Sequence, residues 1–123
     1  MATLNDRVLD NGLTVLDTEA NRVDICSQEP ASYAEATSTY TLGNETSISI
    51  SAPADASPNG RKVTLAAVSG ASVTGTGTAT HYAISDTVNS RLLATGSLSA
   101  SQVVTSGNTF SLTASDIRIP DPA

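Results

Sequence analysis

The side chains with the greatest capacity for chemistry lie around the single histidine of the sequence. Ser85 and Asp86 follow His81 by four and five residues. A hydrolase would need a serine or cysteine activated by the histidine, and an acid that orients the imidazole. The stretch alternates like a strand, which places Ser85 on the side of His81 and Asp86 on the other. We therefore expect His81 to be an ordinary strand residue, and a hydrolase that pairs it with Ser85 or Cys26 is the rival hypothesis.

Cys26 is the only cysteine, so no internal disulfide and no cysteine zinc site can form. It alternates onto the same face as Asp24, which predicts a partly exposed thiol. A catalytic thiol needs a nearby histidine to lower its pKa, and spacing alone does not place His81 there. The single lysine, Lys62, adjoins a loop rich in Pro and Gly and is expected to be a solvated charge. We expect no catalytic residue, no cofactor and no metal site, and hence a protein that is not an enzyme.

Composition favours a single β domain over residues 1–123. Serine and threonine occur 17 times each, charged residues make up 15% of the chain, and no long stretch shows the 3.6-residue periodicity of a helix. The net charge of −6 lacks the basic footprint of a nucleic-acid-binding protein. No apolar run approaches the ~20 residues of a membrane span, and no apolar segment follows the first residues as a secretory signal would require. We therefore expect no nucleic acid or membrane partner, and synthesis in a cytoplasm.

The elements that would position these side chains are mostly strands. Alternating blocks bounded by turn residues predict strands at 23–28, 47–51, 62–68 (with Val63, Leu65 and Ala67 on one face), and several within 78–119. Within the last stretch three pairs are predicted to share a face: Tyr82 with Ile84, Phe110 with Leu112, and Ile117 with Ile119. The expected fold is mainly β, an antiparallel β-sandwich or flattened barrel with a short N-terminal helix.

Other segments are predicted to be short or irregular. The helix is expected over residues 3–10, capped by Thr3 and stopped at Asn11-Gly12. Residues 13–16 are expected to be a short strand or irregular, and residues 28–40 a loop with at most one helical turn. Gly43-Asn44 is expected to separate elements, and residues 69–77 to be a flexible link with at most a short strand at Val73.

Several motifs resemble those of small virion structural proteins of tailed bacteriophages, a family of head-decoration-like and tail-fibre-like β-sandwich proteins. The motifs are Gly-Thr-Ala-Thr-His-Tyr-Ala-Ile-Ser-Asp at 77–86, Leu-Leu-Ala-Thr-Gly-Ser-Leu at 92–98, the turn at 104–110, and Ile-Arg-Ile at 117–119. A short helix followed by residues 23–30 is similar to the preceding segment of that family. The resemblance implies a β-sandwich-like fold and offers no catalytic residues to transfer.

The resemblance leads to an expected role in a virion, after synthesis in a host bacterial cytoplasm. The first expectation is a capsid decoration or cement protein on the outside of a phage head, bound to the major capsid protein or another virion protein. The alternatives are a tail, collar or fibre-base component, and a host- or carbohydrate-binding module. We expect a homo-oligomer, with a trimer as the first hypothesis.

Two terminal arms, residues 1–4 and 120–123, are the candidate protein interface, with the loop at 52–60 as a further candidate. A small acidic domain offers a modest polar contact, so firm attachment calls for self-association or for an arm laid across a neighbour. The candidate interface residues are Met1, Ala2, Thr3, Leu4, Pro120, Asp121, Pro122 and Ala123.

Overall fold

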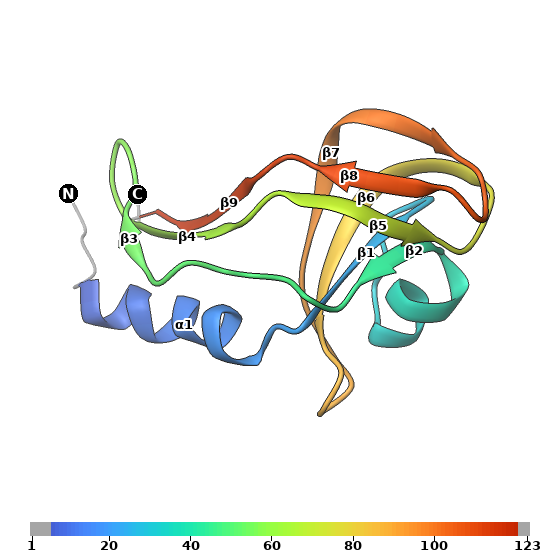
Figure 1. Ribbon diagram of the computed structural model, residues 1–123. Coiled ribbons are helices and arrows are strands. Elements are labelled where there is room, and N and C mark those ends of the chain that lie inside the picture. The colour runs from blue at the N-terminus through green and yellow to red at the C-terminus, as the bar shows by residue number, and fades with distance from the viewer. Residues whose placement is uncertain (1–5, 121–123) are drawn as a thin grey trace.

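The computed structural model describes residues 6–120, with side chains from Asp10 onward, as a mainly β protein with one N-terminal helix (Figure 1). The predicted fold class is confirmed. The helical elements are α1 (Asp6–Glu19) and the π-helix η1 (Glu35–Thr39). The strands are β1 (Arg22–Cys26), β2 (Thr41–Glu45), β3 (Ala54–Asp55), β4 (Arg61–Leu65), β5 (Val68–Val73), β6 (Gly77–Asp86), β7 (Arg91–Val104), β8 (Thr109–Leu112) and β9 (Ser115–Ile119). No helix in this part of the chain is long and apolar enough to span a membrane.

Two antiparallel sheets build the molecule. The larger one curls into a half-barrel with the strand order β7-β6-β1-β2-β5-β8, and the smaller one has the order β3-β4-β9. β4 leads directly into β5 and β8 into β9, so one long two-stranded ribbon connects the sheets. Figure 1 shows the half-barrel at one end, and α1 with the small sheet at the other. The core is a continuous apolar cluster that runs through both ends.

Strand alternation places the predicted face-sharing pairs against this core. Phe110 and Leu112 are both buried, and Tyr82 packs beside the fully buried Ile84. The third predicted pair, on β9, is half-buried against the same cluster. The period-two pattern therefore predicted the inner face of β8 and β9 correctly, whereas on β6 both faces are buried from Ala83 to Asp86.

The N-terminal helix is longer than predicted. The expected stop at Asn11-Gly12 is wrong, because α1 continues to Glu19, and residues 13–16 are helical rather than extended. Leu13 and Leu16 lie one turn apart and are both buried, so the burial of this face outweighs the roughly 1 kcal/mol that a helical glycine costs. The predicted start at Thr3 lies outside the described residues.

The predicted strand at 47–51 is reduced to one bridge, between Ile50 and Leu65. This segment crosses from β2 in the half-barrel to β3 in the small sheet, so it cannot follow one ladder along its length. The strand predicted at 62–68 ends at Leu65, and Ala67 is exposed rather than sharing the buried face of Val63.

Two segments predicted as irregular are strands. Gly43-Asn44 lies inside β2, where the Phe110 ring covers Gly43: an added Cβ there would lie 2.9 Å from Phe110 Cε1. The absence of a side chain at this position therefore reflects close packing rather than a turn. The link predicted at 69–77 contains most of β5. Residues 28–40 were predicted to be a loop with at most one helical turn, and the structure has a five-residue π-helix there, η1.

Candidate functional site

His81 and Cys26 lie opposite each other on paired strands, but their side chains make hydrogen bonds to other groups. They are direct partners across the β6–β1 ladder. The thiol of Cys26 donates to the carbonyl of Ala36 (3.7 Å), whereas His81 Nδ1 lies 2.9 Å from Thr80 Oγ1. His81 Nε2 lies 4.0 Å from a carboxylate oxygen of Glu29. The expectation of a partly exposed thiol is wrong: Cys26 is fully buried, because η1 covers this face of the sheet through Ala36.

Burial also removes the reactivity of the thiol. Burial is the main reason why the pKa of Cys26 rises from 9.0 to about 12. The negative charge of Asp24 raises this pKa further, and the positive charge of Arg22 lowers it. At neutral pH the group is a neutral thiol and no nucleophile.

We predict that Cys26 resists modification in the folded protein. A disulfide reagent at pH 8 should leave the native thiol unlabelled and label it fully in guanidinium chloride. Because the folded pKa is raised, this group's contribution to stability is fully present below pH 9 and is lost as the pH rises towards 12. Rapid stoichiometric labelling of native protein would show an accessible thiol and revive the cysteine–histidine hypothesis.

Ser85 and Asp86 do not complete a catalytic arrangement with His81. Ser85 is buried opposite Arg22, and within residues 10–120 its hydroxyl has no hydrogen-bond partner. Asp86 accepts hydrogen bonds from the backbone N–H of Val88 (2.9 Å) and the side chain of Asn89 (2.8 Å), which lower its pKa, the Asn89 bond most. Asp86 therefore holds the β6–β7 turn. In the described part of the chain no group of His, Cys, Asp and Glu side chains could hold a metal ion.

Ionic contacts hold the elements together. The sequence pattern did not single out Asp24, whose carboxylate is completely inaccessible. It accepts two hydrogen bonds from Arg22 (2.8 and 2.9 Å) and one from Thr41 Oγ1 (2.7 Å).

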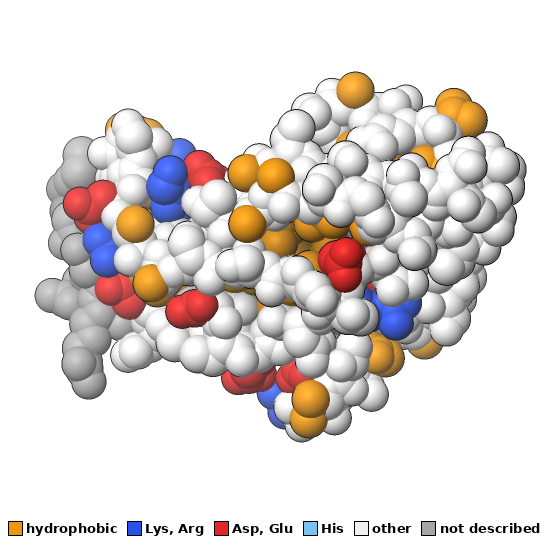
Figure 2. Space-filling model, in the orientation of Figure 1, with side chains coloured by type: hydrophobic (Ala, Val, Ile, Leu, Met, Phe, Trp, Pro, Cys, Tyr) orange, Lys and Arg blue, Asp and Glu red, His pale blue; other side chains and the backbone are white. Residues whose placement is uncertain are grey.

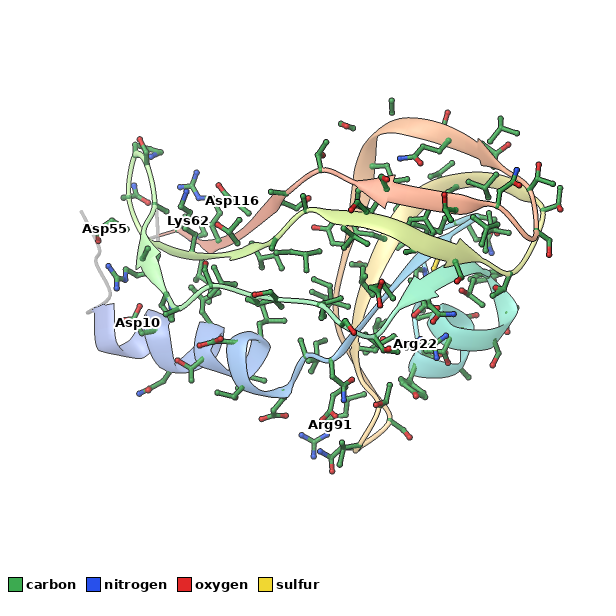
Figure 3. All side chains as sticks on the ribbon, viewed as in Figure 1. Asp10, Arg22, Asp55, Lys62, Arg91 and Asp116 are labelled. Carbon is green, nitrogen blue, oxygen red and sulfur yellow. The ribbon has the colours of Figure 1, made fainter. Side chains whose placement is uncertain are left out.

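At the small-sheet end, Arg61 binds Asp10 and Asp55. Lys62 was expected to be a solvated charge; its ammonium lies 3.1 Å from a carboxylate oxygen of Asp116. Figure 3 shows Asp10, Asp55, Lys62 and Asp116 at the small-sheet end of the molecule, whereas Arg22 lies apart from them at the start of β1.

The most distinctive surface feature is an open groove where the half-barrel fails to close. Its two edge strands are β7 and β8, which do not pair with each other in the described sheet. Between them lies a groove of about 340 Å³, lined by residues 97–100 and Gln102 on one side and residues 111–115 on the other, with Leu65 and Tyr82 at its base. All of the lining residues are uncharged. The outline of the molecule is notched between its two ends, and hydrophobic side chains are exposed there (Figure 2).

A large bulge in β7 forms one wall of the groove. Ser97 is the register partner of His81 and Gln102 that of Ala79, so five residue steps on β7 oppose two on β6. The intervening residues 98–101 have no partner in the β6 ladder. Gln102 Nε2 reaches across and donates to the carbonyl of Ser111 (3.4 Å), a side-chain contact where a closed barrel would have a backbone ladder. β-Bulges, usually of one extra residue, are common at the edges of sheets.

This arrangement is suited to binding an extended polypeptide. Unpaired edges present backbone N–H and C=O groups to any chain that can lie between them. Alternation alone did not reveal the groove, because it predicts which side chains face inward and not whether the first and last strands of a sheet meet. The small residues at 97 and 99–101, around Leu98, were the available signal.

The predicted interface residues lie largely outside the described part of the chain, namely residues 1–4 and 121–123. Pro120 is exposed at the end of β9, where its Cα lies close to Gly60. The loop at 52–60 contains β3, which pairs with β4.

No family model, curated protein or solved structure matches this chain. The motif resemblance to phage virion proteins therefore stays a hypothesis drawn from the sequence.

Proposed function

We propose that the protein is a structural component of a tailed-phage virion, and specifically a decoration protein bound in many copies to the outside of the head. The observation that carries the proposal is the uncharged groove between two unpaired sheet edges, which is a surface suited to contact with another polypeptide. Its partner is the major capsid protein or another virion protein. Attachment is non-covalent.

The position of the family-like motifs supports this role. Residues 77–86 form β6, residues 92–98 lie in β7 up to its bulge, and residues 104–110 make the turn from β7 into β8. The resemblance to virion proteins is therefore concentrated in the strands that build and flank the groove. A protein whose recognisable motifs surround a contact surface is better suited to assembly than to catalysis.

The chemistry of the remaining side chains favours the same class of function. Cys26 is buried and protonated, and Asp86 holds a turn, so the hydrolase hypothesis has no activated nucleophile among these residues. A carbohydrate-binding module stacks sugars on exposed aromatic rings. Here Phe110 is buried and Tyr33, Tyr40 and Tyr82 are all at least partly buried, so the described surface offers no wide aromatic platform.

Self-association is part of the proposal, with a trimer as the expected state. A single polar contact of a small acidic domain binds weakly, and joining several copies raises the overall affinity without improving any one contact. Salt should weaken attachment only modestly, because the sequence has only six cationic side chains that could form ion pairs with a partner.

The number of copies per purified particle separates the hypotheses. A decoration protein should be present at hundreds of copies, in a fixed ratio to the major capsid protein. A tail, collar or fibre-base component, the second candidate, should be present at a few to a few dozen copies. A host- or sugar-binding module that acts away from the particle should be absent from it.

A further inference from the structure

We propose that the groove between β7 and β8 receives residues 1–5 of a second copy of this chain as an added β-strand. The inference names the partner segment in the self-association that the proposed function calls for. The strand exchange is nonetheless a property of the isolated protein, so it can be tested without a virion.

The groove offers the backbone groups that an added strand needs. One wall is the outer edge of β7, an edge strand of the sheet, along its bulged part at residues 98–101. The other wall is the outer edge of β8, continued by Thr113 and Ala114, which belong to no strand; an added strand would replace the contact from Gln102 to the carbonyl of Ser111. Main-chain hydrogen bonds to such edges supply affinity, and pockets for alternate side chains supply specificity.

The chemistry of the groove selects an uncharged segment. Buried Leu65 and Leu112, with the half-buried ring of Tyr82, make an apolar base, while serines dominate the exposed walls. A charged side chain placed there would lose hydration without gaining a partner. The occupant should therefore carry uncharged side chains only.

Of the two terminal segments, the N-terminal one fits this description. Residues 1–5 read Met-Ala-Thr-Leu-Asn, with no charged side chain and no proline; in an extended conformation Ala2 and Leu4 would face one side, and Met1, Thr3 and Asn5 the other. The C-terminal residues 120–123 read Pro-Asp-Pro-Ala. Two of these lack a backbone N–H and one carries a charge, which makes them poor partners for a ladder in an uncharged groove.

Length and position indicate a donor from another copy. Five extended residues span about 17 Å, enough to lie along residues 111–115 on the β8 side of the groove, which span about 14 Å. Asp10 of α1 is tied to Arg61, which is opposite Ile119 on β9, and Ile119 lies roughly 14 Å of strand away from Ser115 at the near end of the groove. A further helical turn of about 6 Å leads away from the groove to Asp6. Figure 1 shows that α1 begins at the end of the molecule remote from the half-barrel.

Residues 1–5 of the same copy would therefore reach no further than the near end of the groove in that copy. A neighbouring copy has no such constraint. Reciprocal exchange between two copies gives a dimer, and head-to-tail exchange that closes gives a ring such as the expected trimer.

The primary test places a charge in the groove with a matched control beside it. Ala114 lines the groove, whereas Ala67 lies on the adjoining strand connection and does not, and both are exposed and outside any strand. Ala114→Arg should weaken self-association of the full chain at least about tenfold, the equivalent of about 1.4 kcal/mol, and Ala67→Arg should leave it unchanged. Multi-angle light scattering and sedimentation equilibrium, with circular dichroism as a check of folding, make the comparison.

A crosslinking experiment identifies the segment. Two differently tagged copies would carry Thr3→Cys and Ser99→Cys respectively, with Cys26 protected by its burial. Oxidation should join them, whereas Thr3→Cys with Ser38→Cys, at an exposed position in η1, should stay unjoined. A full chain that is monomeric over the whole accessible concentration range, equal behaviour of the two arginine variants, or equal crosslinking to both positions would overturn the proposal. A chain that exchanges strands but is absent from particles would overturn only the virion role.

Discussion

Replacing Asp24 by alanine is expected to lower the free energy of unfolding by about 3 kcal/mol. The carboxylate is completely inaccessible, and its removal leaves the guanidinium of Arg22 partly buried without its bidentate partner and Thr41 without its 2.7 Å acceptor. Breaking a buried pair from one side costs more than the pair contributes, because a desolvated charge remains. Arg22 keeps 20% of its side chain exposed, which holds the expected loss at the lower end of the usual range. Urea denaturation at pH 7 measures it.

Asp116→Ala provides the matched control. That carboxylate also pairs with a cation, Lys62, and with a threonine, Thr64 (2.7 Å), but it is exposed to solvent. Its removal should change the unfolding midpoint much less than the removal of Asp24 does. Equal effects of the two substitutions would mean that burial does not strengthen the Asp24 cluster.

Leu13→Ala should also destabilise the protein by about 3 kcal/mol, since the removal of a buried leucine side chain typically costs about 2–5 kcal/mol. Leu13 is 1% exposed and belongs to the helical face that packs on β4 and β9. The loss combines the transfer energy of the deleted carbons with the cavity they leave.

Val15→Ala on the same helix serves as its control. Val15 is 39% exposed, so shortening it should change stability only slightly. If the two substitutions had equal effects, or if Val15→Ala had the larger one, the buried face of α1 would be wrongly assigned. The pair therefore tests the helix beyond Gly12, the segment where the structure departs most from the sequence-based prediction.

β8 and β9 were predictable because their alternation is regular and their burial is one-sided. Phe110 and Leu112 occupy successive inward positions of one short strand, and a single core covers them. The end of β1 was predicted to within two residues, but the burial of its second face was not predicted. The sequence shows Asp24 and Cys26 alternating with Val23 and Ile25, yet all four are buried. η1 packs over Cys26 through Ala36, and Arg22 and Thr41 bind the Asp24 carboxylate.

The remaining errors share a physical origin in tertiary contacts. Gly12 and Gly43 are both turn signals by composition, yet one lies in a helix held by Leu13 and the other beneath the ring of Phe110. Ile48 and Ile50 alternate as in a strand but pack on the core while the chain passes between sheets. The groove escaped prediction for a related reason: closure of a sheet depends on strands far apart in the ladder, which local patterns do not describe.

The central claim, that this is a structural protein of a phage particle, is tested most directly by its stoichiometry relative to the major capsid protein in purified virions. Quantitative mass spectrometry with isotope-labelled peptides of both proteins gives the number of copies of this protein per copy of the major capsid protein. Disrupted particles that have been washed free of soluble protein serve as the control for protein that is not attached. A decoration protein predicts a fixed ratio, at hundreds of copies per particle, that survives repeated purification. Absence from the particles, or a ratio that falls towards zero with each purification step, would contradict the claim.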